Sequence, residues 1–244
     1  MIPYFVFDRI TLGPIELATW GLLVGLAFTA GYFWLLYQAR QKNIWPIKII
    51  GLALAAFIGA IIGARLLFLL QTPADFLTGL KSFNGGAMFY GGLLGGVLGS
   101  WLYLKAIGEK FWPLADLTAP AVALGIGIGR LGCFLINDHQ GSLTSLPWGI
   151  LWPDGLVRHP VALYESLAGF ILFALLWYLK NKLTRPGQLF LTFMAGYAIA
   201  RFGLDFFREA QSWLADPRYL TLTFSQWLSI GILAAALFWW PKKK

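Results

Sequence analysis

The stretch KIIGLALAAFIGAIIGARLLFLL, residues 48–70, is 23 residues long and contains only two charged side chains, Lys48 and Arg65. A helix needs about 20 mostly apolar residues to cross a bilayer, so this stretch predicts a transmembrane helix. Similar apolar runs recur along the whole chain. We place seven spans, near residues 18–37, 48–70, 86–107, 113–136, 160–179, 187–206 and 221–240.

The composition indicates the same class. Hydrophobic residues make up 58% of the 244 residues and charged residues only 12%, about half the share usual in soluble domains. The segments between the spans are too short to form a separate soluble domain. We therefore predict an all-α polytopic membrane protein, a seven-transmembrane-helix bundle in which residues 1–244 form one membrane domain. Residues 1–17 form an outer interfacial arm, and residues 137–159 form an outer loop.

The basic residues predict the orientation of this bundle. Segments on the N-terminal side carry five Lys and Arg. Those on the other side carry eleven, including Lys48 and Lys105 at the ends of spans, and the remaining three arginines lie deeper inside spans. Basic residues accumulate in cytoplasmic loops, so we expect the N-terminus outside and the C-terminus in the cytoplasm. The formal net charge of +8 is therefore a topology signal and does not indicate a nucleic-acid partner.

Several kinds of site are absent from the sequence. The single cysteine, Cys133, excludes an internal disulfide and a cysteine-based zinc site. The chain has no P-loop, no dinucleotide fingerprint after a strand and no HExxH motif, so we expect no metal and no cofactor. The spacing of Gly91, Gly95 and Gly99 is instead typical of small-residue seams, along which two membrane helices approach closely.

Three arginines, Arg65, Arg130 and Arg201, lie in or near the apolar spans. An arginine at mid-membrane costs about 2.5–3.5 kcal/mol on insertion scales, so each needs a compensating partner. Two interpretations stay open for them. They form internal salt bridges that hold the bundle together, or they line a polar cavity that binds an anion, because a guanidinium matches phosphate oxygens in a bidentate manner.

The acidic residues that are candidates to pair with these arginines are Glu165, Asp205 and Asp116. Tyr197, Arg201 and Asp205 follow one another at intervals of four residues, so they share one helix face.

Seven motifs then occur in order along the chain. They are LGPIELATWGL (12–22), GARL (63–66), YGGLLGG (90–96), GRLGCFLINDHQG (129–141), HPVALYE (159–165), GQLFLTFMAGYAIARFGLDFFRE (187–209) and LTFSQWLS (222–229). With these motifs the chain resembles, nearly from end to end, the phosphatidylglycerol–prolipoprotein diacylglyceryl transferase family. The resemblance implies transfer of the diacylglyceryl group of phosphatidylglycerol to the lipobox cysteine of a preprolipoprotein. The products are a thioether and glycerol 1-phosphate, and the setting is the bacterial cytoplasmic (inner) membrane with its lipids.

The resemblance also implies a set of site residues. Arg130 and Arg201 would hold the lipid phosphate, with Tyr197 beside them, as the catalytic group. The substrate-binding residues would be Arg65, Tyr90, Gly91, Gly92, Cys133, Asp138, His139, Gly141, Glu165 and Trp20.

The chain departs from the family pattern at four of these positions. Tyr90 stands where the family has a histidine cast as the base, and a phenol with a pKa near 10 is a poor base at neutral pH. Cys133 replaces an asparagine, Asp138 is a shorter acid, and Trp20 replaces a tyrosine. Asp138 and His139 are candidates for a displaced base, whereas we expect His159, which precedes a proline at the start of a helix, to be structural.

Three functions therefore stay open at this point. The first is an active diacylglyceryl transferase that works without the family's histidine. The second is a divergent transferase with another lipid donor or acceptor. The third is a lipid- or anion-binding membrane protein, or a transporter, that kept the arginine cavity without the chemistry.

Overall fold

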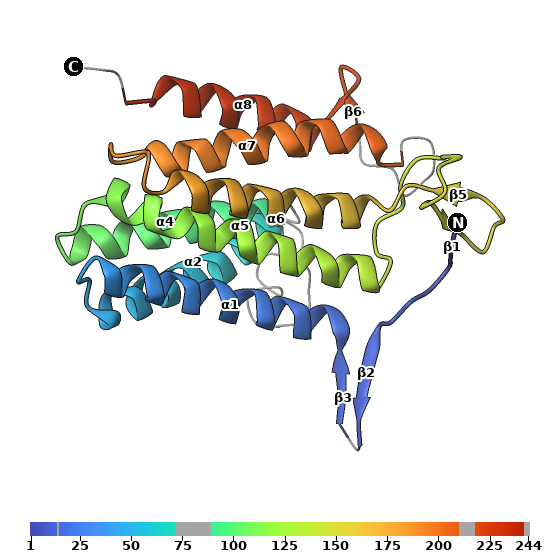
Figure 1. Cartoon of the computed structure of the whole chain (residues 1–244), viewed down its shortest axis with the longest axis horizontal. Coiled ribbons are helices and arrows are strands. Elements are labelled where there is room, and N and C mark those ends of the chain that lie inside the picture. Colours follow the sequence, from blue (N-terminus) through green and yellow to red (C-terminus); the bar gives the residue numbers. More distant parts are fainter. Residues whose placement is uncertain (14, 72–88, 210–217, 242–244) are drawn as a thin grey trace. The chain divides into compact units, whose positions relative to one another are not determined.

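The computed structural model describes residues 1–13, 15–71, 89–209 and 218–241 (Figure 1). Each predicted span contains one helix, and the ends agree within a few residues; residues 86–88 of the third span lie outside the described part. The described helices are α1 (Thr19–Gln41), α2 (Pro46–Gln71), α4 (Phe89–Ala106), α5 (Phe111–Leu135), α6 (Val161–Leu179), α7 (Gln188–Leu204) and α8 (Phe224–Phe238), with the short 3₁₀ helix η2 (Asp205–Phe207) after α7.

Five of these helices are long and apolar enough to cross a membrane, namely α1, α2, α5, α6 and α7 together with η2. Helix α8 is apolar but has only 15 residues. Large apolar side chains point outward from the helices; for example, Ile171 is 69% exposed and Leu237 is 67% exposed. An outer surface of this kind suits lipid rather than water, so the fold is that of a polytopic membrane protein.

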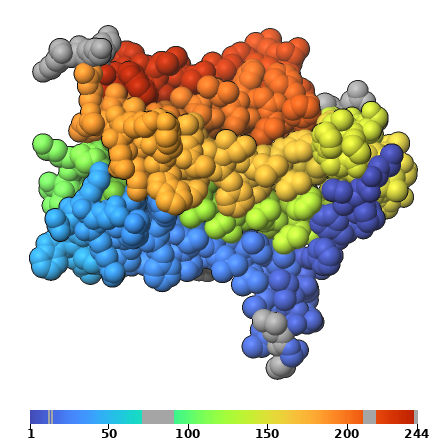
Figure 2. All heavy atoms as spheres, viewed as in Figure 1, coloured from blue at the N-terminus to red at the C-terminus, as the bar shows by residue number. Residues whose placement is uncertain are grey.

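Short strands lie outside the helices, and the all-α prediction did not include them. Strands β2 (Arg9–Leu12) and β3 (Ile15–Ala18) pair antiparallel, with Gly13 at a positive φ of 63° beside the turn. This hairpin occupies most of the predicted interfacial arm and projects away from the helices (Figures 1 and 2).

A second small sheet joins the N-terminus to the loop 137–159. Strand β1 (Ile2–Pro3) pairs in parallel with β4 (Ile150–Leu151), and β4 pairs antiparallel with β5 (Val157–Arg158). A third pair, β6 (Arg218–Tyr219) and β7 (Leu222–Thr223), leads into α8.

The chain divides into two compact units, which we describe separately. Residues Leu35–Leu114 form the second unit, and Met1–Trp34 together with Ala115–Lys244 form the first. In the second unit α2 packs along α4. A Cβ atom on Gly91 would lie 2.2 Å from the carbonyl oxygen of Gly63, and one on Gly95 would lie 2.1 Å from that of Gly59. The predicted small-residue seam is therefore confirmed, because no larger residue fits there.

In the first unit, α6, α7 and α8 lie side by side (Figure 1). A Cβ atom on Gly169 of α6 would lie 2.6 Å from the backbone nitrogen of Gly127 in α5, and the Ser166 hydroxyl donates to the Gly127 carbonyl at 2.7 Å. These glycines let α5 and α6 nearly touch. The core of the unit lies beside this contact and consists of Ala119, Ala123, Leu172, Leu176, Leu189 and Phe193.

One of the three acids proposed as an arginine partner has another task. The carboxylate of Asp116 accepts hydrogen bonds from the backbone nitrogens of Gly187, at 2.6 Å, and Phe190, at 2.8 Å. These donors belong to the first turn of α7, whose amides have no partners within the helix. Asp116 therefore fixes the start of α7.

Candidate active site

Arg130 of α5 and Arg201 of α7 meet at one carboxylate. Nη1 of Arg130 lies 3.0 Å from Oε2 of Glu165, and Nη1 of Arg201 forms an ion pair with Oε1 of the same residue. Glu165 belongs to α6, between the other two helices, and its side chain is only 6% exposed. The two arginines are 71 positions apart in the sequence, and they meet because α6 contacts α5 at the glycines and also packs against α7.

Arg201 is held from a second direction as well. Its Nη2 lies 3.1 Å from Oδ1 of Asp205 and donates to the Ser225 hydroxyl at 3.1 Å. The fully buried Asp205 carboxylate also accepts a hydrogen bond from the Thr223 hydroxyl and lies 3.7 Å from Nε of Arg208.

Three arginines and two carboxylates thus form one cluster with a formal charge of +1. Its members are Arg130, Arg201, Arg208, Glu165 and Asp205. A cluster with excess positive charge, whose arginines are fixed in place by carboxylates, suits the binding of an anion.

A cavity opens beside this cluster. It has about 330 Å³ of empty space, a value that includes its open mouth. The residues that line it are Ile126, Arg130, Glu165, Ala168, Gly169, Leu172, Tyr197, Ala200, Arg201 and Leu204. One wall is therefore charged and the rest is apolar, a combination that suits the junction of a lipid headgroup with its chains.

The structure brings the three residues of the predicted catalytic group to this one cavity. Tyr197 lies one helical turn before Arg201, and its ring stacks on Phe193 with 6.2 Å between the ring centres. Both arginines also form internal salt bridges, to Glu165 and, for Arg201, to Asp205 as well, so the two interpretations of the sequence analysis both stay open.

A second group of side chains begins one turn beyond Arg130. The buried Cys133 follows Arg130 by three residues in α5, about one helical turn. Oδ2 of Asp138 lies 3.1 Å from Nδ1 of His139. The close approach of His139 lowers the pKa of Asp138, burial opposes the shift, and the charges of His139, Arg130 and Arg208 add to it. Cys133, Asp138 and His139 therefore gather at the end of α5 nearest the loop 137–159.

Gly141 has a packing role. It forms an isolated β-bridge with Arg208, and a Cβ atom at this position would lie 2.2 Å from the carbonyl oxygen of His159. The position needs glycine because two backbones meet there. Its predicted contact with substrate stays a prediction.

His159 lies against aromatic neighbours. Its Nδ1 is 3.1 Å from the Tyr164 hydroxyl, and its ring centre is 5.0 Å from that of Phe207. Burial lowers the pKa of His159, so the neutral ring is favoured. These contacts support the structural role expected for it.

Trp20 lies in the first turn of α1 and is 48% exposed. It packs against the backbone of α5, since a Cβ atom on Gly132 would lie 3.5 Å from Trp20 Cδ1. Its contact with substrate also stays a prediction.

Four predicted site residues belong to the second unit. Gly91 and Gly92 face α2, and the Arg65 guanidinium lies 5.6 Å from the centre of the Phe68 ring. The side chain of Tyr90 lies outside the described part of the structure. Substrate binding by these four residues stays a prediction.

Thr223 and Ser225 were not among the predicted site residues. Thr223 caps the start of α8 and donates to Asp205, and Ser225, in the first turn of α8, accepts from Arg201. The available signal was the pattern Thr223–x–x–Gln226, which predicts a capping box and hence a helix start; the structure contains that capping box.

Comparison with known proteins adds an independent observation. A family model described as prolipoprotein diacylglyceryl transferase matches residues 8–241. A Legionella pneumophila protein named phosphatidylglycerol–prolipoprotein diacylglyceryl transferase is 35% identical over 246 aligned residues, covering 96% of this chain and 95% of that protein. Proteins of the same name from Solidesulfovibrio magneticus and Coxiella burnetii are 33% and 32% identical, and the alignments cover 95% and 94% of this chain and 89% and 92% of those proteins.

Proposed function

Because the chain belongs to the prolipoprotein diacylglyceryl transferase family, we propose that it transfers the diacylglyceryl group of phosphatidylglycerol to the lipobox cysteine of a prolipoprotein. The enzyme is a transferase of lipoprotein maturation. The observation that carries the proposal is the convergence of Arg130 and Arg201 on one cavity with a charged wall and apolar remaining walls.

The charge that develops in the reaction explains why two arginines are useful. The cysteine thiol gives up its proton to solvent, its sulfur forms a bond to the glyceryl carbon that carries the phosphate ester, and the carbon–oxygen bond breaks. The electron pair of that bond goes to the phosphate oxygen, so a singly charged diester becomes glycerol 1-phosphate with a second ionisable oxygen. Guanidinium groups fixed in a site of low dielectric stabilise this charge as it grows.

Glu165 would keep both arginines in position without blocking them. A guanidinium carries five N–H donors, and the contacts of Arg201 with Glu165, Asp205 and Ser225 use only part of them. The remaining donors are available to a phosphate in the cavity. We assign Tyr197, which lines the same cavity, to the phosphate or the headgroup as an additional hydrogen-bond donor.

We further propose that Tyr90 is not the general base. Arg65, Tyr90, Gly91 and Gly92 of the second unit, and Trp20 and Gly141 of the first, are proposed to contact or shape the substrate site. This assignment rests on their positions in the motifs that resemble the family's.

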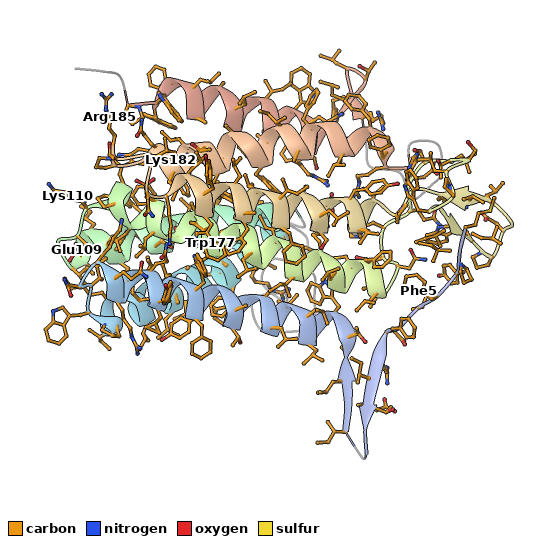
Figure 3. The ribbon with its side chains drawn as sticks, viewed as in Figure 1. Phe5, Glu109, Lys110, Trp177, Lys182 and Arg185 are labelled. Atoms are coloured by element: carbon orange, nitrogen blue, oxygen red, sulfur yellow. The ribbon has the colours of Figure 1, made fainter. Side chains whose placement is uncertain are left out.

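The proposed topology has seven spans, with the N-terminus and the loop 137–159 outside, in the inner membrane of a bacterium. The pairing of Ile2 with Ile150 supports a common side for the N-terminus and that loop. Phe5 lies at that end of the first unit, and Lys182 and Arg185 lie at the opposite end (Figure 3). Eleven basic residues lie on the side of Lys182 and five on the side of the N-terminus, so we propose that the Lys182 end faces the cytoplasm.

A transfer assay tests the function. The full chain in detergent is mixed with phosphatidylglycerol and a fluorescent lipobox peptide, and the lipidated peptide is separated and measured. We expect product with wild type and with Arg40→Ala, an exposed arginine at the end of α1, and at least a hundredfold less with Arg130→Ala. Binding of phosphatidylglycerol without product in wild type would favour a lipid-binding protein that lacks the chemistry.

A further inference from the structure

The chain turns sharply where α5 ends, and this turn folds two polar residues back onto the helix. Asn137 has a positive φ of 51°, and the backbone nitrogen of Asp138 donates to the Cys133 carbonyl at 3.2 Å. As a result the Cys133 sulfur, a carboxylate oxygen of Asp138 and a ring nitrogen of His139 all lie within 4.8 Å of one another.

We propose that Cys133, Asp138 and His139 bind a divalent metal ion of the Zn²⁺ class, and that the acceptor cysteine thiol occupies the ion's fourth position. Thiolate, imidazole and carboxylate are the three ligand types that Zn²⁺ uses. Three protein ligands with one open position are typical of catalytic rather than structural zinc.

The geometry fits such an ion. Ligand atoms around a tetrahedral Zn²⁺ are about 3.3–3.8 Å apart, given bond lengths of about 2.0–2.3 Å. In the structure the three atoms lie within 4.8 Å of one another, so a contraction of about 1 Å brings them to that separation. Asp138 is 51% exposed and His139 is 26% exposed, so an ion and a peptide have access from the side of the loop.

The single cysteine of the chain excludes a zinc site built from several thiolates, whereas a mixed site needs only one. A thiolate and a carboxylate together balance the charge of the ion.

Two nearby guanidiniums limit how tightly the ion binds. Arg130 and Arg208 both act electrostatically on Asp138, and positive charges disfavour a cation. Arg130 is also one helical turn from Cys133, so its charge is close to a second ligand of the proposed ion. We therefore expect weaker binding than at a structural zinc site.

The role of the ion in catalysis rests on the proposed function, whereas ion binding does not. A thiol that coordinates Zn²⁺ loses its proton, which passes to water. The metal-bound sulfur then forms the bond to the glyceryl carbon, the carbon–oxygen bond breaks, and the neutral thioether leaves the ion. A free cysteine with a pKa of about 8.5 is about 3% thiolate at pH 7, so coordination raises the reactive fraction by about thirtyfold.

The position of Cys133 one helical turn after Arg130 links the two halves of the reaction. The proposed ion activates the acceptor thiol one helical turn from the arginine that holds the phosphate of the donor. The assignment also gives the chain a source of thiolate that does not depend on position 90.

Cobalt substitution tests the site directly. The full chain without a histidine tag is stripped with a chelator and titrated with Co²⁺, whose tetrahedral complexes with thiolate absorb strongly in the near ultraviolet. We expect one equivalent to bind, with loss of the thiolate band in Cys133→Ala and Cys133→Asn and at least tenfold weaker binding in His139→Ala and Asp138→Asn.

The matched control is His159→Ala, which removes the only other histidine of the chain and should leave the band unchanged. Near-ultraviolet circular dichroism reports whether each variant is folded, and Cys133→Asn provides a second replacement that fills the same space. Absence of the band in wild type, or its persistence in folded Cys133→Asn, would overturn the metal site.

Addition of a lipobox peptide to the cobalt-loaded protein, without lipid donor, tests the fourth position. A cysteine peptide should increase the thiolate band, because a second sulfur joins the ion, and a serine peptide should not. No increase would overturn the thiol-binding role. Removal of the metal should slow transfer at pH 7 by about ten- to thirtyfold, and Zn²⁺ should restore it. A cobalt-loaded protein that shows the band but transfers no lipid under any condition would refute the proposed function and leave the site standing.

Discussion

The shared carboxylate of Glu165 is the most informative position to perturb. It is 6% exposed and pairs with both Arg130 and Arg201. Breaking a buried ion pair typically costs about 3–5 kcal/mol, because the partner charge is left uncompensated. In Glu165→Gln the amide oxygen still accepts one hydrogen bond, so we expect a loss of stability near the lower end, about 3 kcal/mol.

This loss corresponds to a decrease in melting temperature of about 6–12 °C for a chain of this size. Thermal unfolding in detergent micelles measures it. The control is Glu109→Gln, which breaks a pair with Lys48 in which the carboxylate side chain is 35% exposed. An exposed pair contributes less than about 1 kcal/mol, so the control should shift the melting temperature by at most a few degrees.

The same substitution should strengthen the response to an anionic lipid. Without the carboxylate, the cluster gains one positive charge, and a phosphate takes over the compensation of the two arginines. Phosphatidylglycerol should therefore raise the melting temperature of Glu165→Gln more than that of wild type, although the misplaced arginines should slow transfer. An effect of Glu165→Gln no larger than that of Glu109→Gln, or no added response to the lipid, would refute the reasoning that Glu165 organises a phosphate site.

Three further predictions concern single residues. Arg130→Lys and Arg201→Lys should each lower kcat/KM for the lipobox peptide about a hundredfold or more, because a point charge cannot reproduce bidentate contact; near-normal rates would show that charge alone suffices. Tyr90→Phe should slow the initial rate at most about tenfold, the value of one neutral hydrogen bond of about 0.5–1.5 kcal/mol, and a thousandfold loss rescued by Tyr90→His would make position 90 the base. Burial lowers the pKa of His159 in the folded protein. The neutral His159 ring therefore stabilises the fold fully above pH about 6.5, its ordinary pKa, and this stabilisation is lost as the pH falls towards the lower folded-state pKa. His159→Gln should therefore lose less stability than wild type between pH 7.5 and pH 5.5, as measured by thermal unfolding at the two values, and identical losses would contradict this.

The helices could be predicted closely from the sequence, and the reason is physical. A membrane span must be long and apolar whatever it packs against, so the run 48–70 predicts helix α2 almost to its ends. The short strands could not be predicted this way. The pairing of Ile2–Pro3 with Ile150–Leu151 involves two residues on each side, and such short pairs depend on tertiary contacts rather than on a local pattern.

The sequence predicted which residues belong to the candidate site but not which of them form ion pairs with one another. The cost of burying Arg130 and Arg201 indicated that they needed partners, and Glu165 was among the acids considered. Its bridging of both arginines follows from the close approach of Gly127 and Gly169, a contact between helices that sequence spacing does not show. Asp116 was a candidate for the same reason, and its carboxylate anchors the start of α7.

The group of Cys133, Asp138 and His139 at the end of α5 could not be predicted from the sequence either. A single cysteine in the sequence argued against a metal, because sequence rules count cysteines. The backbone turn at Asn137 then places a carboxylate and an imidazole against that cysteine. Only the path of the chain after the helix reveals the group.

Direct detection of both products tests the central claim most closely. The purified full chain is incubated with phosphatidylglycerol of defined acyl chains and a lipobox peptide, and mass spectrometry follows the peptide while the released phosphate ester is quantified. The account predicts a peptide heavier by one diacylglyceryl group, attached through sulfur, and an equal molar amount of glycerol 1-phosphate, with neither product from a serine peptide. A protein that binds phosphatidylglycerol but yields no thioether, or that releases glycerol 1-phosphate without modifying the peptide, would contradict it.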